Sequence, residues 1–122
     1  MNIALWIVQV ILAGVFVFHG RMLLNPPAQV QPAMSYIHDL QPGLRRFIGA
    51  LEILAGVGLI LPALTNILPV LTPLAAAGLV IVMGGAAVYH LMRREYPNIA
   101  FNLILLALAA FVAYGRFVLV PM

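Results

Sequence analysis

Four polar residues that can bind a ligand or carry a proton lie inside long apolar stretches of the sequence. They are His19, Glu52, His90 and Asn102. A carboxyl group and imidazoles can exchange protons, and an amide can both donate and accept hydrogen bonds. Ionisable residues inside a membrane-spanning helix are costly and usually face the interior of a helix bundle, so we treat these four as candidate ligand-binding residues.

The stretches that contain these residues are long enough to cross a lipid bilayer as helices. Of the 122 residues, 65% are hydrophobic and 7% are charged, whereas a soluble domain has about a quarter charged residues. Each run approaches the roughly 20 residues that a spanning helix needs, and none alternates as a strand does. We therefore predict an all-α transmembrane four-helix bundle in a single domain, residues 1–122. The expected helices cover residues 3–24, 44–61, 69–92 and 98–120.

The second run is unusually short, and the first run lies where a signal peptide would lie. The second run is short and is closed by Pro62, so we expect it to include residues 44–46 and to tilt in the bilayer. The first run is compatible in position with a cleaved signal peptide. It lacks a basic flank, and its apolar stretch of about 22 residues exceeds the hydrophobic region of a signal peptide. We expect it to remain as the first span.

The arginines predict how the helices are oriented in the membrane. Five of the six basic residues flank the first and third connections, namely Arg21, Arg45, Arg46, Arg93 and Arg94. The positive-inside rule makes loops 25–43 and 93–98 cytoplasmic and places both termini outside. Arg116 is the remaining cation, and we expect it to anchor the fourth helix at the outer interface beside Tyr114.

The first connection has an apolar pattern of its own. Val30, Met34, Ile37 and Leu40 recur at helical spacing, with polar residues between them. A short interfacial helix within residues 27–40 fits this pattern, and so does a disordered loop. The pattern alone leaves the two alternatives open.

The four candidate residues are expected at a similar depth in the membrane. Glu52 lies six residues beyond Arg46, which corresponds to roughly 9 Å of helical rise. By the same rule, the two histidines and Asn102 lie roughly 5–9 Å below the arginine-rich interface. One polar residue thus comes from each predicted helix. We expect them to line one pocket in the cytoplasmic half of the bundle.

An alternative without a ligand is also consistent with this pattern. Glu52 shares a helix face with Gly49 and Gly56, and small residues mark the side on which helices approach one another. Glu52 would then point inward simply to pair with a cation. The available partners are His19, Arg21 and His90.

Several kinds of chemistry find no support in the residues. The chain has no cysteine, which excludes thiolate nucleophiles and cysteine-ligated metals. No ligand pair has the spacing of a preformed metal site, so no metal is expected. His19 and His90 lie at matched depth and could clamp a haem, but two histidines are weak evidence and haem is not expected. No motif of a nucleophile or a phosphate-binding loop is present, and the arginines are too dispersed to bind nucleic acid.

The order and spacing of these features resemble the DoxX-like family of small four-helix bacterial membrane proteins. The resemblance covers nearly the whole chain. Its parts are Val17-Phe18-His19-Gly20-Arg21, Gly49-x-x-Glu52 with Gly56, Leu79-x-x-x-Met83-x-Gly85-Ala86-x-x-x-His90, Arg94-Glu95, Asn102-Leu103 and Gly115-Arg116. The resemblance implies a transmembrane helical bundle in the bacterial cytoplasmic (inner) membrane. It also implies a link to quinone-coupled sulfur oxidation or to membrane complexes that respond to oxidative stress. Related groups use cysteine, so direct thiol chemistry is not expected of this chain.

Three functions are consistent with these residues and with the resemblance. The first is binding of a quinone or another small lipophile together with a redox partner, in which Glu52 and the imidazoles bind a carbonyl or carry a proton. The second is an accessory or structural subunit of a larger membrane complex, or a self-associating protein, with no chemistry of its own. A proton-coupled exporter ranks last, because the first helix has no acid. We expect a non-catalytic subunit and not a stand-alone enzyme, since no electron carrier or activated nucleophile is visible.

Overall fold

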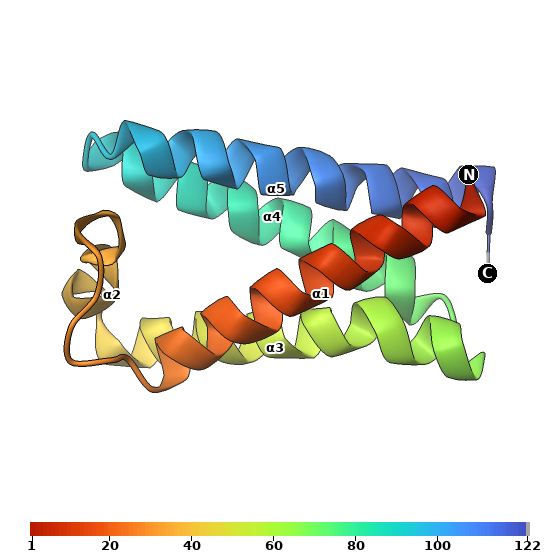
Figure 1. The fold of residues 1–122 in the computed structure, drawn as a ribbon, viewed down its shortest axis with the longest axis horizontal. Coiled ribbons are helices and arrows are strands. Elements are labelled where there is room, and N and C mark those ends of the chain that lie inside the picture. Colours follow the sequence, from red (N-terminus) through yellow and green to blue (C-terminus); the bar gives the residue numbers. More distant parts are fainter. Residues whose placement is uncertain (122) are drawn as a thin grey trace.

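Four long helices form an up-and-down bundle in the computed structural model, which describes residues 1–121 (Figure 1). They are α1 (Asn2–Leu24), α3 (Pro42–Thr65), α4 (Leu71–Met92) and α5 (Tyr96–Tyr114), the last continued by the π-helical turn η2 (Gly115–Leu119). No strand is present within residues 1–121. All four helices are long and apolar enough to cross a bilayer. The predicted all-α class is confirmed, and the helices are compatible with a transmembrane bundle.

The bundle has two different ends. At the loop end lie the α4–α5 turn and residues 25–41, which we call the cover segment; at the terminal end lie both chain termini and the α3–α4 turn (Figure 1). Helix α1 packs mainly against α3, and α4 packs mainly against α5. The core between them contains Leu12, Phe16, Leu59, Ala76, Leu79, Met83, Leu105, Ala109 and Val112. The outer faces are apolar and exposed, as expected where lipid is the solvent.

Helices α1 and α3 cross very closely at two glycines. A Cβ atom at Gly49 would lie 2.7 Å from the carbonyl oxygen of Gly20, and a Cβ atom at Gly20 would lie 2.6 Å from the carbonyl oxygen of Gly49. Only glycine permits this approach of the two backbones. The crossing sets the distance between the residues that flank it, His19 and Glu52.

Helix α3 is longer than the sequence pattern predicts. The expected end at Leu61 is wrong, because the helix continues through Pro62 to Thr65. Proline has no N–H, so it frees the carbonyl four residues earlier, which is that of Gly58. The hydroxyl of Thr72 in α4 donates to this carbonyl at 3.0 Å. The helix therefore tolerates its proline because a neighbouring helix satisfies the freed acceptor.

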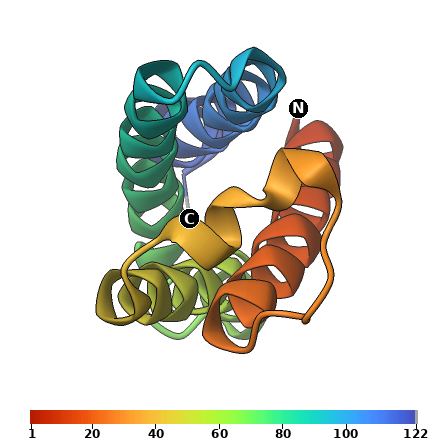
Figure 2. The same ribbon diagram turned by 90° about the vertical axis from the view of Figure 1, so that its left-hand side faces the viewer.

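The cover segment folds into two short helices, η1 (Pro32–Met34) and α2 (Tyr36–Asp39), which lie across the loop end of the bundle (Figure 2). Of the apolar residues in the predicted pattern, Ile37 is completely buried, and Met34 and Leu40 line cavities of the bundle. A continuous helix over residues 27–40 does not form. The segment contains three prolines, each of which lacks a backbone donor, and these interrupt helix formation.

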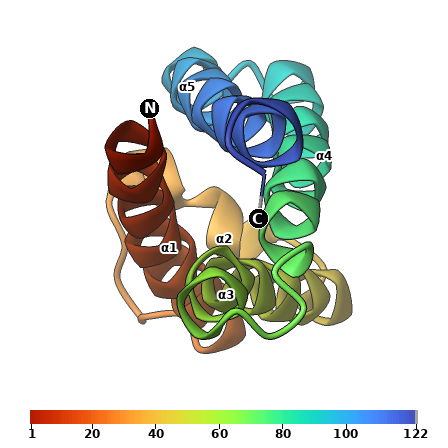
Figure 3. The same ribbon diagram turned by 90° about the vertical axis from the view of Figure 1, so that its right-hand side faces the viewer.

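Arg116 at the terminal end is buried, contrary to its predicted role as an exposed anchor. Its side chain is 2% exposed, its Nε donates to Gln9 Oε1 at 2.8 Å, and its Nη1 donates to Asn2 Oδ1 at 2.8 Å. Helix α1 crosses from α3 at the loop end to α5 at the terminal end (Figures 1 and 3). That crossing brings the polar face of α1 over the arginine, which a span-by-span analysis of the sequence could not anticipate.

Candidate ligand-binding site

His19 of α1 and Glu52 of α3 form the innermost polar pair of the loop end. The Nδ1 atom of His19 lies 2.6 Å from Glu52 Oε1. Glu52 is 1% exposed, so its carboxylate is removed from water and depends on this partner. The glycine crossing beside the pair provides the short separation of the two helices. Internal pairing of Glu52 with His19, which the sequence left as one alternative, is therefore present.

Tyr36 of α2 extends this pair toward the membrane surface. Its hydroxyl lies 2.6 Å from His19 Nε2. Burial, together with the carboxylates of Glu52 and Glu95, raises the pKa of Tyr36 and keeps the phenol protonated. In the neutral imidazole with its proton on Nδ1, Nδ1–H donates to Glu52 and the tyrosine hydroxyl donates to Nε2. Both ring nitrogens of His19 are thereby hydrogen-bonded.

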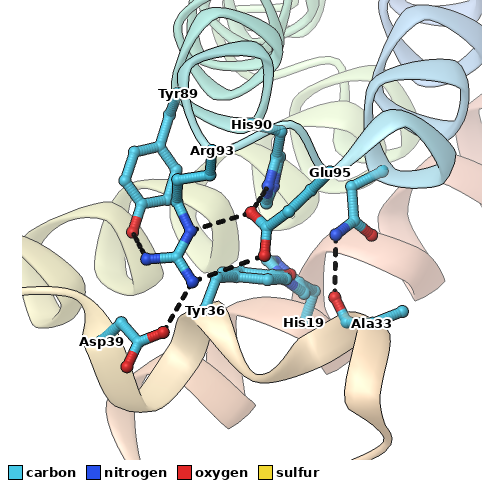
Figure 4. Close-up of polar contacts among 9 residues, drawn as sticks. His19, Ala33, Tyr36, Asp39, Tyr89, His90, Arg93 and Glu95 are labelled. Carbon is cyan, nitrogen blue, oxygen red and sulfur yellow. Dashed lines mark hydrogen bonds and ion pairs between the residues drawn. The ribbon is translucent and has the colours of Figure 1, made fainter.

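His90 of α4 lies on the other side of the tyrosine ring. It is 4% exposed, and its ring meets that of Tyr36 edge to face with 4.6 Å between centroids. Its Nδ1 lies 2.8 Å from Glu95 Oε1 in the α4–α5 turn (Figure 4). Burial by itself raises the pKa of Glu95, but hydrogen bonds from His90 and Arg93 outweigh it and lower that pKa below its ordinary value.

Arg93 joins the α4–α5 turn to the cover segment. Its Nε donates to Glu95 Oε1 at 3.0 Å, and its Nη2 donates to Asp39 Oδ2 at 2.6 Å (Figure 4). These two carboxylates raise the pKa of the guanidinium. A second hydrogen bond links the cover segment to the first turn of α5, where Asn98 Nδ2 donates to the carbonyl of Ala33 at 2.8 Å. The cover segment is thus attached to the bundle at both of its short helices.

Asn102 of α5 is buried without a complete set of partners. It is 7% exposed, and its Nδ2 has no hydrogen-bond partner among residues 1–121. Buried amide donors are nearly always paired, and an unpaired one costs about 1–3 kcal/mol. This donor is therefore a position at which an additional acceptor would be favourable.

A cavity of about 340 Å³, which we call the head cavity, lies beneath the cover segment. All four residues predicted from the sequence line it, together with Tyr36 and apolar side chains of α3 and α4. A second cavity of about 310 Å³, the α1–α5 cavity, adjoins it and shares His19, Tyr36, Met83, His90 and Asn102. Small-molecule sites have volumes of about 300–1,000 Å³ and mostly apolar walls with a few polar groups. The head cavity has both properties.

Sequence reasoning missed two members of this arrangement. Tyr36 lies in a connection, where depth cannot be counted along a helix, and its only sequence signal is its position next to the apolar Ile37. Glu95 follows an arginine pair in loop 93–98, where depth cannot be counted along a helix either. Within residues 1–121, no three His, Asp or Glu side chains are grouped so that they could hold a metal ion.

Comparison with known proteins gives one match. The family model described as the DoxX-like family matches residues 7–112, which is most of the chain. No significant match is found among curated proteins or among solved structures. The arrangement described above, with four apolar helices around a cavity that holds a few polar groups, is thus that of a multi-pass membrane protein, and the chain belongs to the DoxX-like family.

Proposed function

We propose that this protein binds a quinone or another small lipophile in the head cavity and acts as part of a redox-linked membrane system. The observation that carries the proposal is the unpaired amide donor of Asn102 in the wall of this cavity. A quinone has carbonyl oxygens that accept hydrogen bonds and an apolar ring that suits the apolar walls. Binding would satisfy a donor that otherwise remains unpaired in the protein interior.

The proposed ligand would lie next to a chain of groups that can move protons. Glu52, His19 and Tyr36 follow one another with 2.6 Å between successive polar atoms. Reduction of a quinone to a quinol takes up protons, and a hydrogen-bonded chain that reaches the cover segment offers a route for them. The protein would supply binding and protons, while a partner protein would supply electrons.

The same proposal includes a location and an orientation. We place the protein in the bacterial cytoplasmic membrane with the loop end on the cytoplasmic side. Five arginines lie at or beside this end, in agreement with the positive-inside rule. The termini would then lie outside.

One observation favours the second candidate function, an accessory subunit without a ligand. Glu52 already has a partner in His19, so its carboxylate does not need a bound molecule to be satisfied. In that case the polar cluster would only stabilise the packing of α1, α3 and the cover segment.

The two functions are distinguished by the amount of lipophile that remains bound to purified protein. We would reconstitute wild type, Asn102→Asp and Asn66→Asp in nanodiscs and measure retained quinone by extraction and chromatography. Asn66 caps α3 at the terminal end, so it controls for the same substitution away from the cavity. We expect Asn102→Asp to lose about tenfold or more of the quinone, because an acceptor replaces the donor.

The contrary outcome is also informative. Equal retention in all three proteins, or bulk lipid with protein partners and no quinone, would favour the accessory subunit. Glu52→Gln adds a second test of the first function, since the proposal expects this variant to bind quinone more weakly than wild type.

A further inference from the structure

We infer that the ligand of the head cavity carries a long apolar tail and that this tail lies in a groove between α3 and α4. The inference rests on the proposed function and makes it more specific. It specifies which class of lipophile the protein binds and through which side of the bundle the ligand enters from the bilayer.

The groove begins where the head cavity ends. It has a volume of about 380 Å³, and all ten residues that line it are apolar or glycine. Val82 of α4 lines both the groove and the head cavity. The head cavity, with its few polar groups and its unpaired Asn102 donor, and the wholly apolar groove are therefore neighbours along one helix seam. A molecule with a polar head and a hydrocarbon tail would place its head in the head cavity and its tail in the groove.

The groove is shaped by small residues. On α3 these are Ala55 and Gly58, and on α4 they are Ala75 and Gly78. A Cβ atom at Gly58 would lie 3.1 Å from the Cβ of Ala75, so the two helices are close there. A Cβ atom at Gly78 would meet nothing within 4 Å, so this glycine leaves open space.

The groove is long enough for a tail of several isoprene units. On α4 it extends from Val82 to Leu71, which corresponds to about 16 Å of helical rise. It runs from the loop end toward the terminal end, so the tail would lie at the depth of the hydrocarbon core while the head stays near the arginine-rich interface.

The α1–α5 cavity is the competing path for a tail. Five of the twelve residues that line it are polar, namely His19, Tyr36, His90, Asn98 and Asn102. A hydrocarbon chain placed there would lie against the unpaired Asn102 donor without satisfying it, which is unfavourable. The α3–α4 groove has no such groups, and we therefore assign the tail to it.

The experiment compares a quinone with and without a tail. Menadione and a menaquinone with the same ring and a four-isoprene tail would be titrated into protein in nanodiscs, with empty nanodiscs as the reference. Gly78→Leu fills the open space of the groove, and Leu54→Trp fills it from the other helix at a position that is 68% exposed. Gly14→Leu is the matched control, because a Cβ there also meets nothing within 4 Å and the residue lines none of the cavities.

We expect wild type and Gly14→Leu to bind the tailed quinone more tightly than menadione. Gly78→Leu and Leu54→Trp should bind the tailed quinone about tenfold more weakly than wild type, because the occupied groove no longer admits the chain. Their affinity for menadione should not change, which shows that the head cavity remains intact.

Three results would overturn the inference. Binding of menadione with no gain from the tail, or tailed binding unchanged in both groove variants, would reject the tail groove and leave the proposed function in place. Weaker tailed binding in Leu105→Trp alone would move the tail to the α1–α5 cavity. If wild type binds neither quinone, the proposed function itself fails, and the inference fails with it.

Discussion

The two ends of this bundle both bury polar side chains, but they do so in different ways. At the loop end, Glu52 pairs with His19 beside a cavity in which the Asn102 donor is unpaired. At the terminal end, Arg116 is held by neutral amides such as that of Gln9. Its Nη2 also has no hydrogen-bond partner within residues 1–121, but the residue lines none of the cavities described above. Buried polarity therefore does not by itself identify a site. A site also needs titratable pairs and space for a ligand.

This difference predicts opposite responses to substitution. Polar residues at the terminal end should be required for stability and should have no effect on ligand binding. Asn102 at the loop end should behave in the reverse way, since its unpaired donor costs stability in the absence of a ligand.

The largest effect is expected at Gly49, where the backbones of α1 and α3 cross closely beside the His19–Glu52 pair. Gly49→Leu introduces a side chain against the carbonyl of Gly20 and forces α1 and α3 apart. We expect a loss of about 4 kcal/mol in the free energy of unfolding and the loss of quinone binding, because the His19–Glu52 contact is broken. Thermal unfolding followed by circular dichroism measures the first effect. Gly14→Leu, which meets open space, should unfold as wild type does.

The next effect concerns the terminal end. Gln9 donates to the carbonyl of Leu59 at 2.6 Å and accepts from Arg116, so Gln9→Leu leaves two buried groups without this partner. We expect a loss of about 2 kcal/mol in stability. Quinone affinity, measured at a temperature where the variant is fully folded, should equal that of wild type. A clear loss of affinity without a loss of stability would remove the distinction between the two ends.

A smaller effect is expected from acid at the loop end. The fold lowers the pKa of Glu95 below its ordinary value of 4.5. The Glu95 carboxylate therefore stabilises the fold at pH values above 4.5, and this contribution is lost as the pH falls through the lower folded pKa. The thermal midpoint of wild type should fall on acidification by more than that of Glu95→Gln. Parallel curves for the two proteins would contradict the assigned contacts with His90 and Arg93.

The smallest effect compares the turns at the two ends. Arg94 at the loop end has a φ of 59°, and Leu68 at the terminal end has a φ of 47°. Non-glycine residues are strained in this left-handed region, so glycine should stabilise the fold by about 0.5 kcal/mol at each position. Thermal midpoints of Arg94→Gly and Leu68→Gly test this. A lower midpoint for Arg94→Gly alone would show that the arginine side chain contributes to the loop end.

Much of the fold follows from the sequence, because lipid imposes a simple rule. Helices that span a bilayer must be long and apolar, so four runs predict four spans. The depth of a side chain also follows from counting residues along a helix. This is why the sequence could predict that His19, Glu52, His90 and Asn102 line one cavity. Counting along helices fails at Pro62, where continuation of α3 depends on Thr72 in another helix.

The rest of the site could not be predicted because it depends on contacts between segments. Tyr36 enters the bundle only because the cover segment folds back over the loop end. The burial of Arg116 depends on the crossing of α1 over α5. Neither arrangement leaves a periodic pattern in the sequence, since each involves a single residue whose partners are distant in the chain.

The central claim is that the unpaired amide of Asn102 is there for a ligand, and one thermal-shift measurement tests it directly. Wild type and Asn102→Leu would be unfolded in nanodiscs with and without menaquinone. We predict that Asn102→Leu alone melts at a higher temperature than wild type, because it removes a buried unpaired donor. Quinone at a hundredfold excess over its dissociation constant should stabilise wild type by about 3 kcal/mol. It should stabilise the variant by about 1.4 kcal/mol, because binding without the donor is about tenfold weaker. Equal stabilisation of both proteins, or of neither, would contradict the claim.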